Sequence, residues 1–334
     1  MKEQILRSTP VSRIAAVVAV LVAVVLVAAP WWGSIATERL IGEFMIYLAL
    51  ASLWNLLAGY TGLVSVGQQA YIGFGAYVLI SLALLAGWHP LLAVPVAGIA
   101  AALVAVPVAT LVFRLQGAYF AIGTWVVAEV FRLLCAQLAI LGGGSGISLP
   151  AATMKLLGDS RMWREATIYW LALALGLGAV AMVYVLLRSR IGLALTAIRD
   201  NATASVSLGI RIERVKFAVY IAVAGLTGMV GCLIELQKVR MSPDAAFSVN
   251  DWTAFVIFIV VIGGIGTIEG PIIGTLVYFF LREFLADLGS IYLMILGVLA
   301  IAIMLLAPKG IWGFVQARFG LSLFPTGYRV NLKE

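Results

Sequence analysis

Residues 44–113 read FMIYLALASLWNLLAGYTGLVSVGQQAYIGFGAYVLISLALLAGWHPLLAVPVAGIAAALVAVPVATLVF. This stretch contains no Asp, Glu, Lys or Arg, and it is far longer than the roughly 20 residues that one helix needs to cross a bilayer. Two turn sequences divide it, Gly59-Tyr-Thr-Gly62 and Gly87-Trp-His-Pro90. It therefore predicts three membrane-spanning helices, near 41–58, 63–86 and 91–113.

The composition of the whole chain supports the same conclusion. Of the 334 residues, 63% are hydrophobic and 11% are charged, and the mean hydropathy is +1.10. An ordinary soluble domain has about 45–50% apolar and about 25% charged residues. The composition excludes a typical soluble enzyme, a nucleic-acid-binding domain and a disordered chain. We expect an all-α polytopic transmembrane bundle that forms a single domain over residues 1–334.

The remaining apolar stretches complete a bundle of about ten spans, with eight as the lower bound. Residues 14–37 follow three basic residues and are long enough for an uncleaved first helix rather than a signal peptide. Further spans are expected near 117–140, 166–187, 217–234 and 288–307. Residues 252–281 contain two short apolar runs around a glycine-rich turn, which fit a re-entrant pair, two tilted helices or one merged helix.

The distribution of charge predicts the orientation. With ten crossings and a cytoplasmic N-terminus, roughly twice as many Lys and Arg residues fall inside as outside, as the positive-inside rule requires. Both termini are then cytoplasmic. A merged helix at 252–281 would move the basic C-terminus outside, which the rule disfavours. The formal charge of +7 is explained by these short loops rather than by a nucleic-acid partner.

The segment 188–216 is too polar to span a membrane. Within it, residues 194–208 have apolar side chains at spacings of three and four, and Gly209 is a typical helix stop. This pattern predicts a short amphipathic helix on the cytoplasmic face. Two interpretations are open: a solvated loop that obeys the positive-inside rule, and a docking helix for a cytoplasmic partner.

The stretch from Gly59 to Tyr77 is unusually polar and glycine-rich for a membrane span. Polar groups at membrane depth face a protein partner or water, and glycine lets backbones approach closely. The stretch is therefore either a site of tight helix packing or a broken helix that lines a substrate path. For Asn55 the packing role is the more common one. The candidates for the path are Asn55, Ser65, Gln68, Gln69, Gly73, Gly75 and Tyr77.

Other polar residues give weaker signals. Glu129 and Arg132 are three residues apart on one span and are expected to pair. No phosphate-binding GxxxxGK[ST] loop, metalloprotease motif or nucleophile elbow occurs, and His89 is the only histidine. Cys135 and Cys232 lie in apolar stretches without metal-ligand spacing. We expect no catalytic residues, no metal site and no cofactor bound by this chain.

Taken in order, several motifs resemble the LivM-like permease subunits of bacterial ABC importers for branched-chain amino acids, over nearly the whole chain after about residue 40. They are Leu53-Trp-Asn-Leu-Leu-Ala-Gly59, Gly62-Leu-Val-Ser-Val-Gly67, Gly73-Phe-Gly-Ala-Tyr77, Arg114-Leu-Gln-Gly-Ala-Tyr-Phe-Ala-Ile122, Glu129-Val-Phe-Arg132, Gly192-Leu-Ala-Leu-Thr-Ala-Ile-Arg199-Asp200, Leu208-Gly-Ile210, Gly263-Gly-Ile-Gly-Thr-Ile-Glu-Gly-Pro271 and Pro308-Lys-Gly-Ile311. Two departures occur: Gly67-Gln-Gln-Ala70 replaces a Gly-His-Ala pattern, and Thr203-Ala-Ser205 replaces the Glu-Ala-Ala of a cytoplasmic loop whose Gly209 is kept.

The resemblance implies a multi-pass protein of the bacterial inner membrane that transports branched-chain or related small amino acids. It implies a second homologous permease, two cytoplasmic ATPases that bind ATP, and an extracytoplasmic substrate-binding protein that contacts loops 141–165 and 237–251. Segment 188–216 would be the coupling loop, with Gly192, Arg199, Asp200, Ala204 and Gly209 as its main residues. The alternative is a self-sufficient secondary transporter or channel, for which Glu129 is the strongest intramembrane acid. An intramembrane enzyme has no supporting motif.

Overall fold

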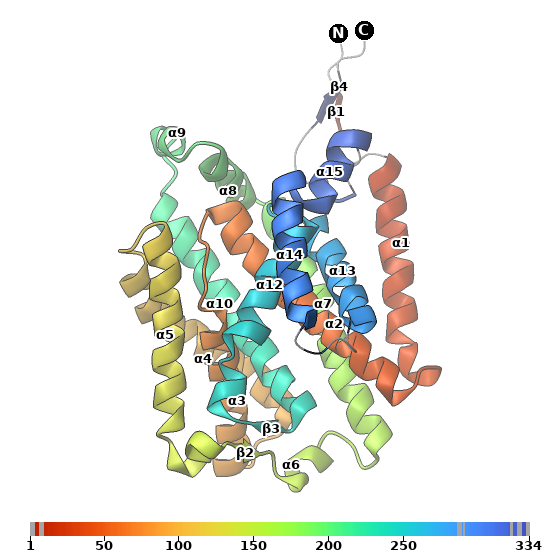
Figure 1. The fold of residues 1–334 in the computed structure, drawn as a ribbon, viewed down its shortest axis with the longest axis vertical. Coiled ribbons are helices and arrows are strands. Elements are labelled where there is room, and N and C mark those ends of the chain that lie inside the picture. Colours follow the sequence, from red (N-terminus) through yellow and green to blue (C-terminus); the bar gives the residue numbers. More distant parts are fainter. Residues whose placement is uncertain are drawn as a thin grey trace.

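The computed structural model describes residues 4–6, 10–285, 289, 291–320, 323–325 and 329–331 of the chain. Long helices form one bundle, in which most elements run along the same long axis (Figure 1). The helices of the bundle are α1 Pro10–Val27, α2 Ile35–Asn55, α3 Gln68–Leu85, α4 Pro90–Val112, α5 Ala118–Ala136, α7 Arg161–Leu187, α10 Ile212–Lys238, α12 Phe255–Gly263, α13 Glu269–Leu285 and α14 Ile291–Leu306.

Shorter elements connect these helices at the two ends of the bundle. The short α-helices are α6 Ala151–Lys155, α8 Arg190–Asp200, α9 Ala202–Ser207, α11 Pro243–Ala246 and α15 Gly310–Phe319. The 3-10 turns are η1 Ala29–Trp31, η3 Ala139–Leu141 and η4 Gly143–Ser145, and the π-helical turns are η2 Leu56–Thr61 and η5 Asn250–Ala254. Two short antiparallel strand pairs complete the fold: β1 Gln4–Leu6 with β4 Arg329–Asn331, and β2 Ile147–Ser148 with β3 Arg240–Met241.

The structure confirms an all-α polytopic membrane protein. Within the described residues, eight helices are long and apolar enough to cross a membrane, and Val11–Val27 is a shorter apolar helix. Large apolar side chains point outward along these helices, such as Ile99 and Leu103 on α4, which are 63% and 67% exposed. In a soluble protein such a surface would be a liability, whereas in a membrane protein lipid or a partner subunit covers it.

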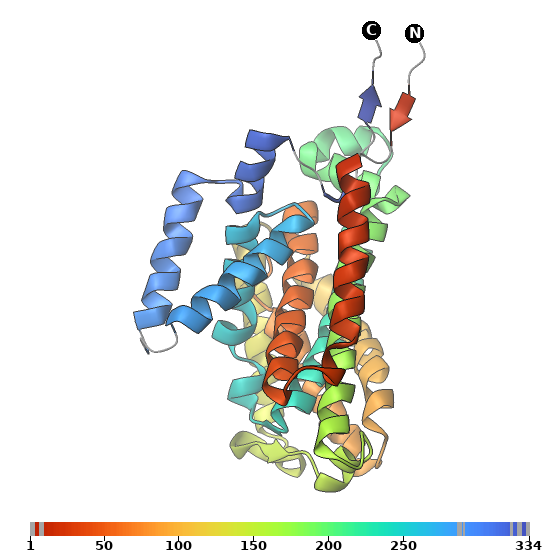
Figure 2. The same ribbon diagram turned by 90° about the vertical axis from the view of Figure 1, so that its right-hand side faces the viewer.

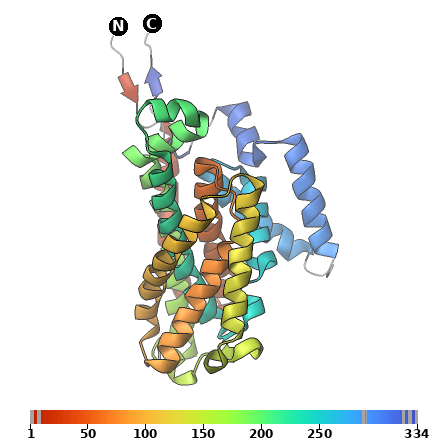
Figure 3. The same ribbon diagram turned by 90° about the vertical axis from the view of Figure 1, so that its left-hand side faces the viewer.

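The first and last described strands, β1 and β4, lie at the same end of the bundle as α8 and α9 (Figures 1 and 2). We call this the α8–α9 end, and we call the opposite end, where β2 pairs with β3, the β2–β3 end. The shared position of β1 and β4 agrees with an even number of crossings between these two strands. Helices α14 and α15 stand at the edge of the bundle (Figures 2 and 3).

Several predicted boundaries were wrong by a turn or more. The first helix was expected over 14–37, but α1 ends at Val27 and residues 35–37 already belong to α2. The span expected over 63–86 begins only at Gln68, because residues 62–67 are not helical. Helices α7 and α10 extend beyond the apolar runs that identified them, because their charged ends lie past the hydrophobic layer while their backbone remains helical.

The segment 252–281 forms two helices, so the merged single helix is excluded. Helices α12 and α13 pack against each other, and residues 264–268 form the turn between them. Gly263 and Gly274 allow this contact, because a Cβ on either would lie 1.9 Å from a backbone oxygen of the facing helix. The two short runs are therefore held together by a face of small residues.

The centre of the bundle is the group α3, α4 and α10. Gly231 of α10 faces the carbonyl of Ile72, and Gly228 lies between Ala101 of α4 and Gly75 of α3. A Cβ on Gly75 would lie 2.0 Å from the carbonyl oxygen of Gly228. These three helices approach so closely only because the contact positions carry little or no side chain.

Candidate functional site

The polar, glycine-rich stretch predicted from sequence contains the irregular link between two candidate spans, Ile35–Thr61 and Gln68–Leu85. We call residues 55–67, where one span ends and the next begins, the broken span. Helix α2 continues into the π-helical turn η2, which ends at Gly62 with a φ of 73°. Residues 62–67 are then irregular before α3 begins at Gln68. The indole of Trp54 donates to the carbonyl of Ser65 at 2.8 Å, and the Val66 amide donates to Thr124 Oγ1 at 3.1 Å. Non-helical backbone is tolerated at this depth because protein groups satisfy it.

Asn55 joins this broken span to the turn between α12 and α13. Its Nδ2 donates to the Thr267 carbonyl at 2.7 Å, and its Oδ1 accepts from the Gly266 amide at 2.8 Å. The side chain is 1% exposed. Gly59 makes the close approach possible, because a Cβ there would lie 2.5 Å from the Gly266 nitrogen. We call this contact the Asn55 lock. It fits the packing role that is common for a single amide in a span.

Gln68 and Gln69 open α3 with both side chains buried, at 4% and 0% exposure. Thr227 of α10 donates to Gln68 Oε1 at 3.4 Å, and Thr253 in η5 donates to Gln69 Oε1 at 2.5 Å. The Nε2 atom of Gln69 is buried without a hydrogen-bond partner among the described residues. The two amides therefore connect α3 to α10 and to η5 in the interior. The Nε2 group of Gln69 keeps its capacity to donate to another partner.

The remaining path candidates lie in packed surroundings. The ring of Phe247 fills the space beside Gly73, where a Cβ would lie 2.4 Å from it, and the same ring stacks on Tyr77 at 6.0 Å. Tyr77 is 4% exposed and Ser65 is 1% exposed. In this arrangement the candidate side chains face protein on all sides. Their assignment to a substrate path stays a prediction.

The segment expected to be one helix over 194–208 is two helices. Asn201 ends α8 with extended backbone, and its Oδ1 then accepts from the Ala204 amide at 3.0 Å to begin α9. The prediction of a continuous helix failed because asparagine is one of the best N-cap residues and interrupts the regular backbone. Gly209 has a φ of 81° directly after α9, which confirms the predicted stop.

Helix α8 lies against the broken span. Leu195 and Ile198 are 0% and 5% exposed, whereas Val206 and Leu208 in and after α9 are 60% and 77% exposed. The guanidinium of Arg199 lies 5.7 Å from the centre of the Tyr60 ring, and a Cβ on Gly266 would lie 3.6 Å from its Nη1. Residues 190–209, which we call the docking segment, thus combine an inner face in contact with the Asn55 lock and an exposed apolar outer part.

The other residues predicted for this segment have separate positions. A Cβ on Gly192 would lie 2.1 Å from the Leu187 carbonyl oxygen, so this glycine lets α8 turn back on the end of α7. Asp200 is 66% exposed and accepts from Arg199 at 3.4 Å, and Ala204 is exposed. Their role in coupling stays a prediction.

Arg132 binds two acids. It donates to Glu129 at 2.6 Å on the same helix, and to Asp244 of α11 at 2.5 Å. The side chain of Asp244 is 78% exposed. The pair expected from the sequence is therefore part of a three-membered ion cluster that ties α11 to α5 near the β2–β3 end.

We expect this cluster to contribute little to stability. Replacing Asp244 with asparagine should change the stability of the protein by less than about 1 kcal/mol, because exposed ion pairs are screened by water and salt. A double-mutant cycle of R132Q and D244N, measured by thermal unfolding in detergent, checks this. A coupling energy well above that value would instead indicate a shielded, structural ion cluster.

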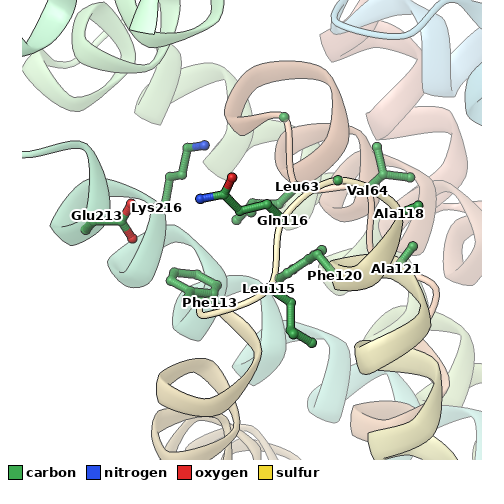
Figure 4. Close-up of a pocket in the computed structure, with 12 residues that line it drawn as sticks. Leu63, Val64, Phe113, Leu115, Gln116, Ala118, Phe120, Ala121, Glu213 and Lys216 are labelled. Atoms are coloured by element: carbon green, nitrogen blue, oxygen red, sulfur yellow. The ribbon is translucent and has the colours of Figure 1, made fainter. Parts of the chain in front are cut away.

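A cavity of about 530 Å³ opens at the α8–α9 end. Its walls come from three places: the irregular segment after η2, the turn between α4 and α5, and the first turn of α10 (Figure 4). Its lining residues are Gly62, Leu63, Val64, Phe113, Leu115, Gln116, Gly117, Ala118, Phe120, Ala121, Glu213 and Lys216.

The sequence analysis missed these cavity residues and several partners of the buried amides. Glu213 and Lys216 were treated as part of the polar loop, although they lie on the first turns of α10. Their spacing of three on an emerging helix, followed directly by an apolar run, was a signal available from sequence. The partners Thr227 and Thr253 had no such signal, because an isolated threonine in a span is common.

Comparisons with known proteins identify the family of the chain. Residues 36–308 match the family model described as branched-chain amino acid transport system / permease component. The chain is 30% identical over 310 residues to the high-affinity branched-chain amino acid transport system permease protein LivM of Escherichia coli, covering 86% of this chain and 72% of that protein. The Salmonella typhimurium LivM protein is 29% identical over the same coverage.

A more distant relative is the probable branched-chain amino acid transport permease protein LivM of Methanocaldococcus jannaschii. It is 28% identical over 173 residues, which cover 52% of this chain and 49% of that protein. No solved structure matches the chain. Because the family model extends across most of the described helices, from α2 to the end of α14, the chain belongs to the permease component family of branched-chain amino acid transport systems.

Proposed function

We propose that this chain is a translocating subunit of an ATP-driven importer for branched-chain or related small amino acids, in the inner membrane of a bacterium. The observation that carries the proposal is the docking segment. It stands at one end of a membrane bundle, exposes Val206 and Leu208, and touches the broken span through Arg199. A membrane protein that exposes apolar side chains beyond its lipid-covered helices offers them to a protein partner.

The docking segment is connected to helices on both sides, so movement of this segment would be passed on to them. Helix α8 follows the end of α7, and α9 leads directly into α10, which packs closely on α3 and α4. Arg199 lies beside Tyr60 of η2 and beside Gly266 of the Asn55 lock. A partner that pulls on α9 would therefore move both the start of α10 and the two broken segments that Asn55 joins. Such rigid-body shifts around a fixed path are how alternating access operates.

The proposal includes partner subunits for this chain. The sequence contains no GxxxxGK[ST] phosphate loop, so ATP would be bound and hydrolysed by two cytoplasmic subunits seated on the docking segment. On this proposal the α8–α9 end faces the cytoplasm, and so would both termini. A second homologous permease completes the path. A substrate-binding protein would contact the β2–β3 end, where residues 141–165 and 237–251 are joined by the β2–β3 pair.

The direct test is transport by purified components. The complete complex in proteoliposomes should accumulate radiolabelled leucine only with both ATP and the binding protein. The chain alone should neither hydrolyse ATP nor accumulate leucine. Uptake by the isolated chain, driven by an ion gradient without ATP, would refute the proposal and would indicate a secondary transporter.

Replacing Leu208 with glutamate should disrupt the docking of the ATPases. Burying a leucine at an interface contributes about 1.5–3 kcal/mol, so we expect association to weaken at least tenfold and ATP-driven uptake to fall with it. L208M keeps the apolar contact and is the matched control. Association is measured by co-purification and by titration of the ATPase subunits. Wild-type association of a folded L208E variant would show that Leu208 does not contact the ATPases.

A further inference from the structure

We propose that the cavity at the α8–α9 end is a binding site for a free aliphatic amino acid in its zwitterionic form, held on the cytoplasmic side of the protein. The identity of the ligand and the cytoplasmic location rest on the proposed function, whereas the site itself rests on the residues that line the cavity. Its volume of about 530 Å³ lies within the range of about 300–1,000 Å³ that is usual for small-molecule sites.

The cavity presents one positive and one negative side chain. Lys216 and Glu213 both line it from α10, and neither forms an ion pair with another described residue. Gln116, from the turn between α4 and α5, adds an amide that both donates and accepts. A ligand with a carboxylate and an ammonium group would satisfy Lys216 and Glu213 together. A simple anion or a simple cation would satisfy only one of them.

The other walls are apolar. Figure 4 shows Glu213 and Lys216 on one side of the cavity and Val64, Ala118 and Ala121 on the other. Leu63, Leu115 and Phe120 lie between these two sides, and Phe113 lies on the side of Glu213 and Lys216. A zwitterion with a branched aliphatic side chain matches this division, because its two charges and its hydrocarbon lie at opposite ends of one small molecule. Burial of the hydrocarbon supplies affinity, and the charges supply orientation.

A ligand in the cavity would contact both the start of α10 and the segment that follows η2. Lys216 lies on α10 just after the docking segment, and Gly62 follows the η2 turn that Arg199 contacts through Tyr60. A bound amino acid would bridge these two elements and would oppose any shift of one relative to the other. Amino acid that accumulates in the cytoplasm would thus hold the protein in one arrangement and slow further import.

The test measures equilibrium binding of radiolabelled leucine to the whole complex in lipid nanodiscs, without binding protein or nucleotide. We expect saturable binding that weakens about tenfold in K216A and in E213Q, because each loses one charge-assisted contact. R214A removes a cation from the same turn of α10 but not from the cavity, so it should bind as the wild type does. Co-purification of the partner subunits verifies that each variant is folded.

Displacement by leucine analogues tests which chemical groups of the ligand the cavity recognises. 4-Methylpentanoate lacks the ammonium group and 3-methylbutylamine lacks the carboxylate, so each should displace leucine at least about tenfold less well than unlabelled leucine. O-phosphoethanolamine tests whether the site instead holds a zwitterionic lipid headgroup. A stronger displacement by O-phosphoethanolamine than by leucine would overturn the proposal in favour of a lipid.

The outcomes separate this proposal from the proposed function. Absence of leucine binding, or equal loss in K216A and R214A, would overturn the cavity site while ATP-driven uptake by the same preparation remained intact. Failure of uptake would refute the transporter assignment independently of any binding. The inhibitory consequence is checked with leucine preloaded on the docking-segment side, which should lower the initial uptake rate of the wild type more than that of K216A.

Discussion

Replacing Asn55 with alanine is expected to lower the free energy of unfolding by about 3 kcal/mol and to reduce transport. The substitution removes two hydrogen bonds, to Gly266 and Thr267, and leaves both backbone groups partly buried without a replacement. It also opens a void at a position that is 1% exposed. The thermal midpoint of the purified complex, compared with that of the wild type, measures the loss.

The matched control for Asn55 is Thr61→Val. Thr61 is also buried in the broken span, but its hydroxyl donates to Leu57 within the same turn, so its loss separates no elements. We expect a small effect there. Gly59→Ala tests the lock independently, because its Cβ would press on the Gly266 amide. If N55A and G59A were both as stable and active as T61V, the Asn55 lock would have no role.

The loss of transport in N55A has a structural reason of its own. Arg199 of the docking segment lies beside Gly266 of the Asn55 lock and beside Tyr60 of η2. Without the lock, movement of α8 would no longer shift η2 and the α12–α13 turn together. We therefore expect N55A to retain ATP hydrolysis by the partners while leucine uptake per ATP falls.

Replacing Gly231 with alanine is the second substitution with a large expected effect. A Cβ there would lie 2.0 Å from the carbonyl oxygen of Ile72. This oxygen belongs to the backbone of α3, so it cannot move away by a change of side-chain rotamer. The two helices must separate, and overpacking of this kind costs about 3 kcal/mol. Expression and the thermal midpoint of the complex should both fall.

The control for Gly231→Ala is Gly178→Ala, for which we expect no loss of stability. Gly178 of α7 has no atom within 4 Å of a built Cβ, so alanine there removes helix-weakening glycine without a clash. G178A should be neutral or stabilise by about 0.5–1 kcal/mol. A G231A protein as stable as G178A would mean that the α3–α10 distance adjusts freely, contrary to the close packing described above.

Part of the candidate site was predictable from sequence. The polar, glycine-rich stretch after Asn55 indicated either tight helix packing or a broken helix that lines a substrate path. The structure has a π-helical turn and irregular backbone there, closely packed by other helices, and the path role stays a prediction. The docking segment was predictable from its charge and from Gly209. Its division at Asn201 was missed, because periodicity of apolar residues does not report a capping side chain that ends one helix and starts the next.

The sequence by itself determined the membrane bundle, the approximate spans and the single polar segment between α7 and α10. These follow from local hydrophobicity, because the bilayer acts on each stretch of about 20 residues separately. Only the tertiary structure decided that Asn55 binds Gly266 and Thr267, that Gln69 meets Thr253, and that Lys216 shares a cavity with Val64. Such contacts join residues far apart in the chain, and their partners are set by how closely the helices pack, which no local pattern encodes.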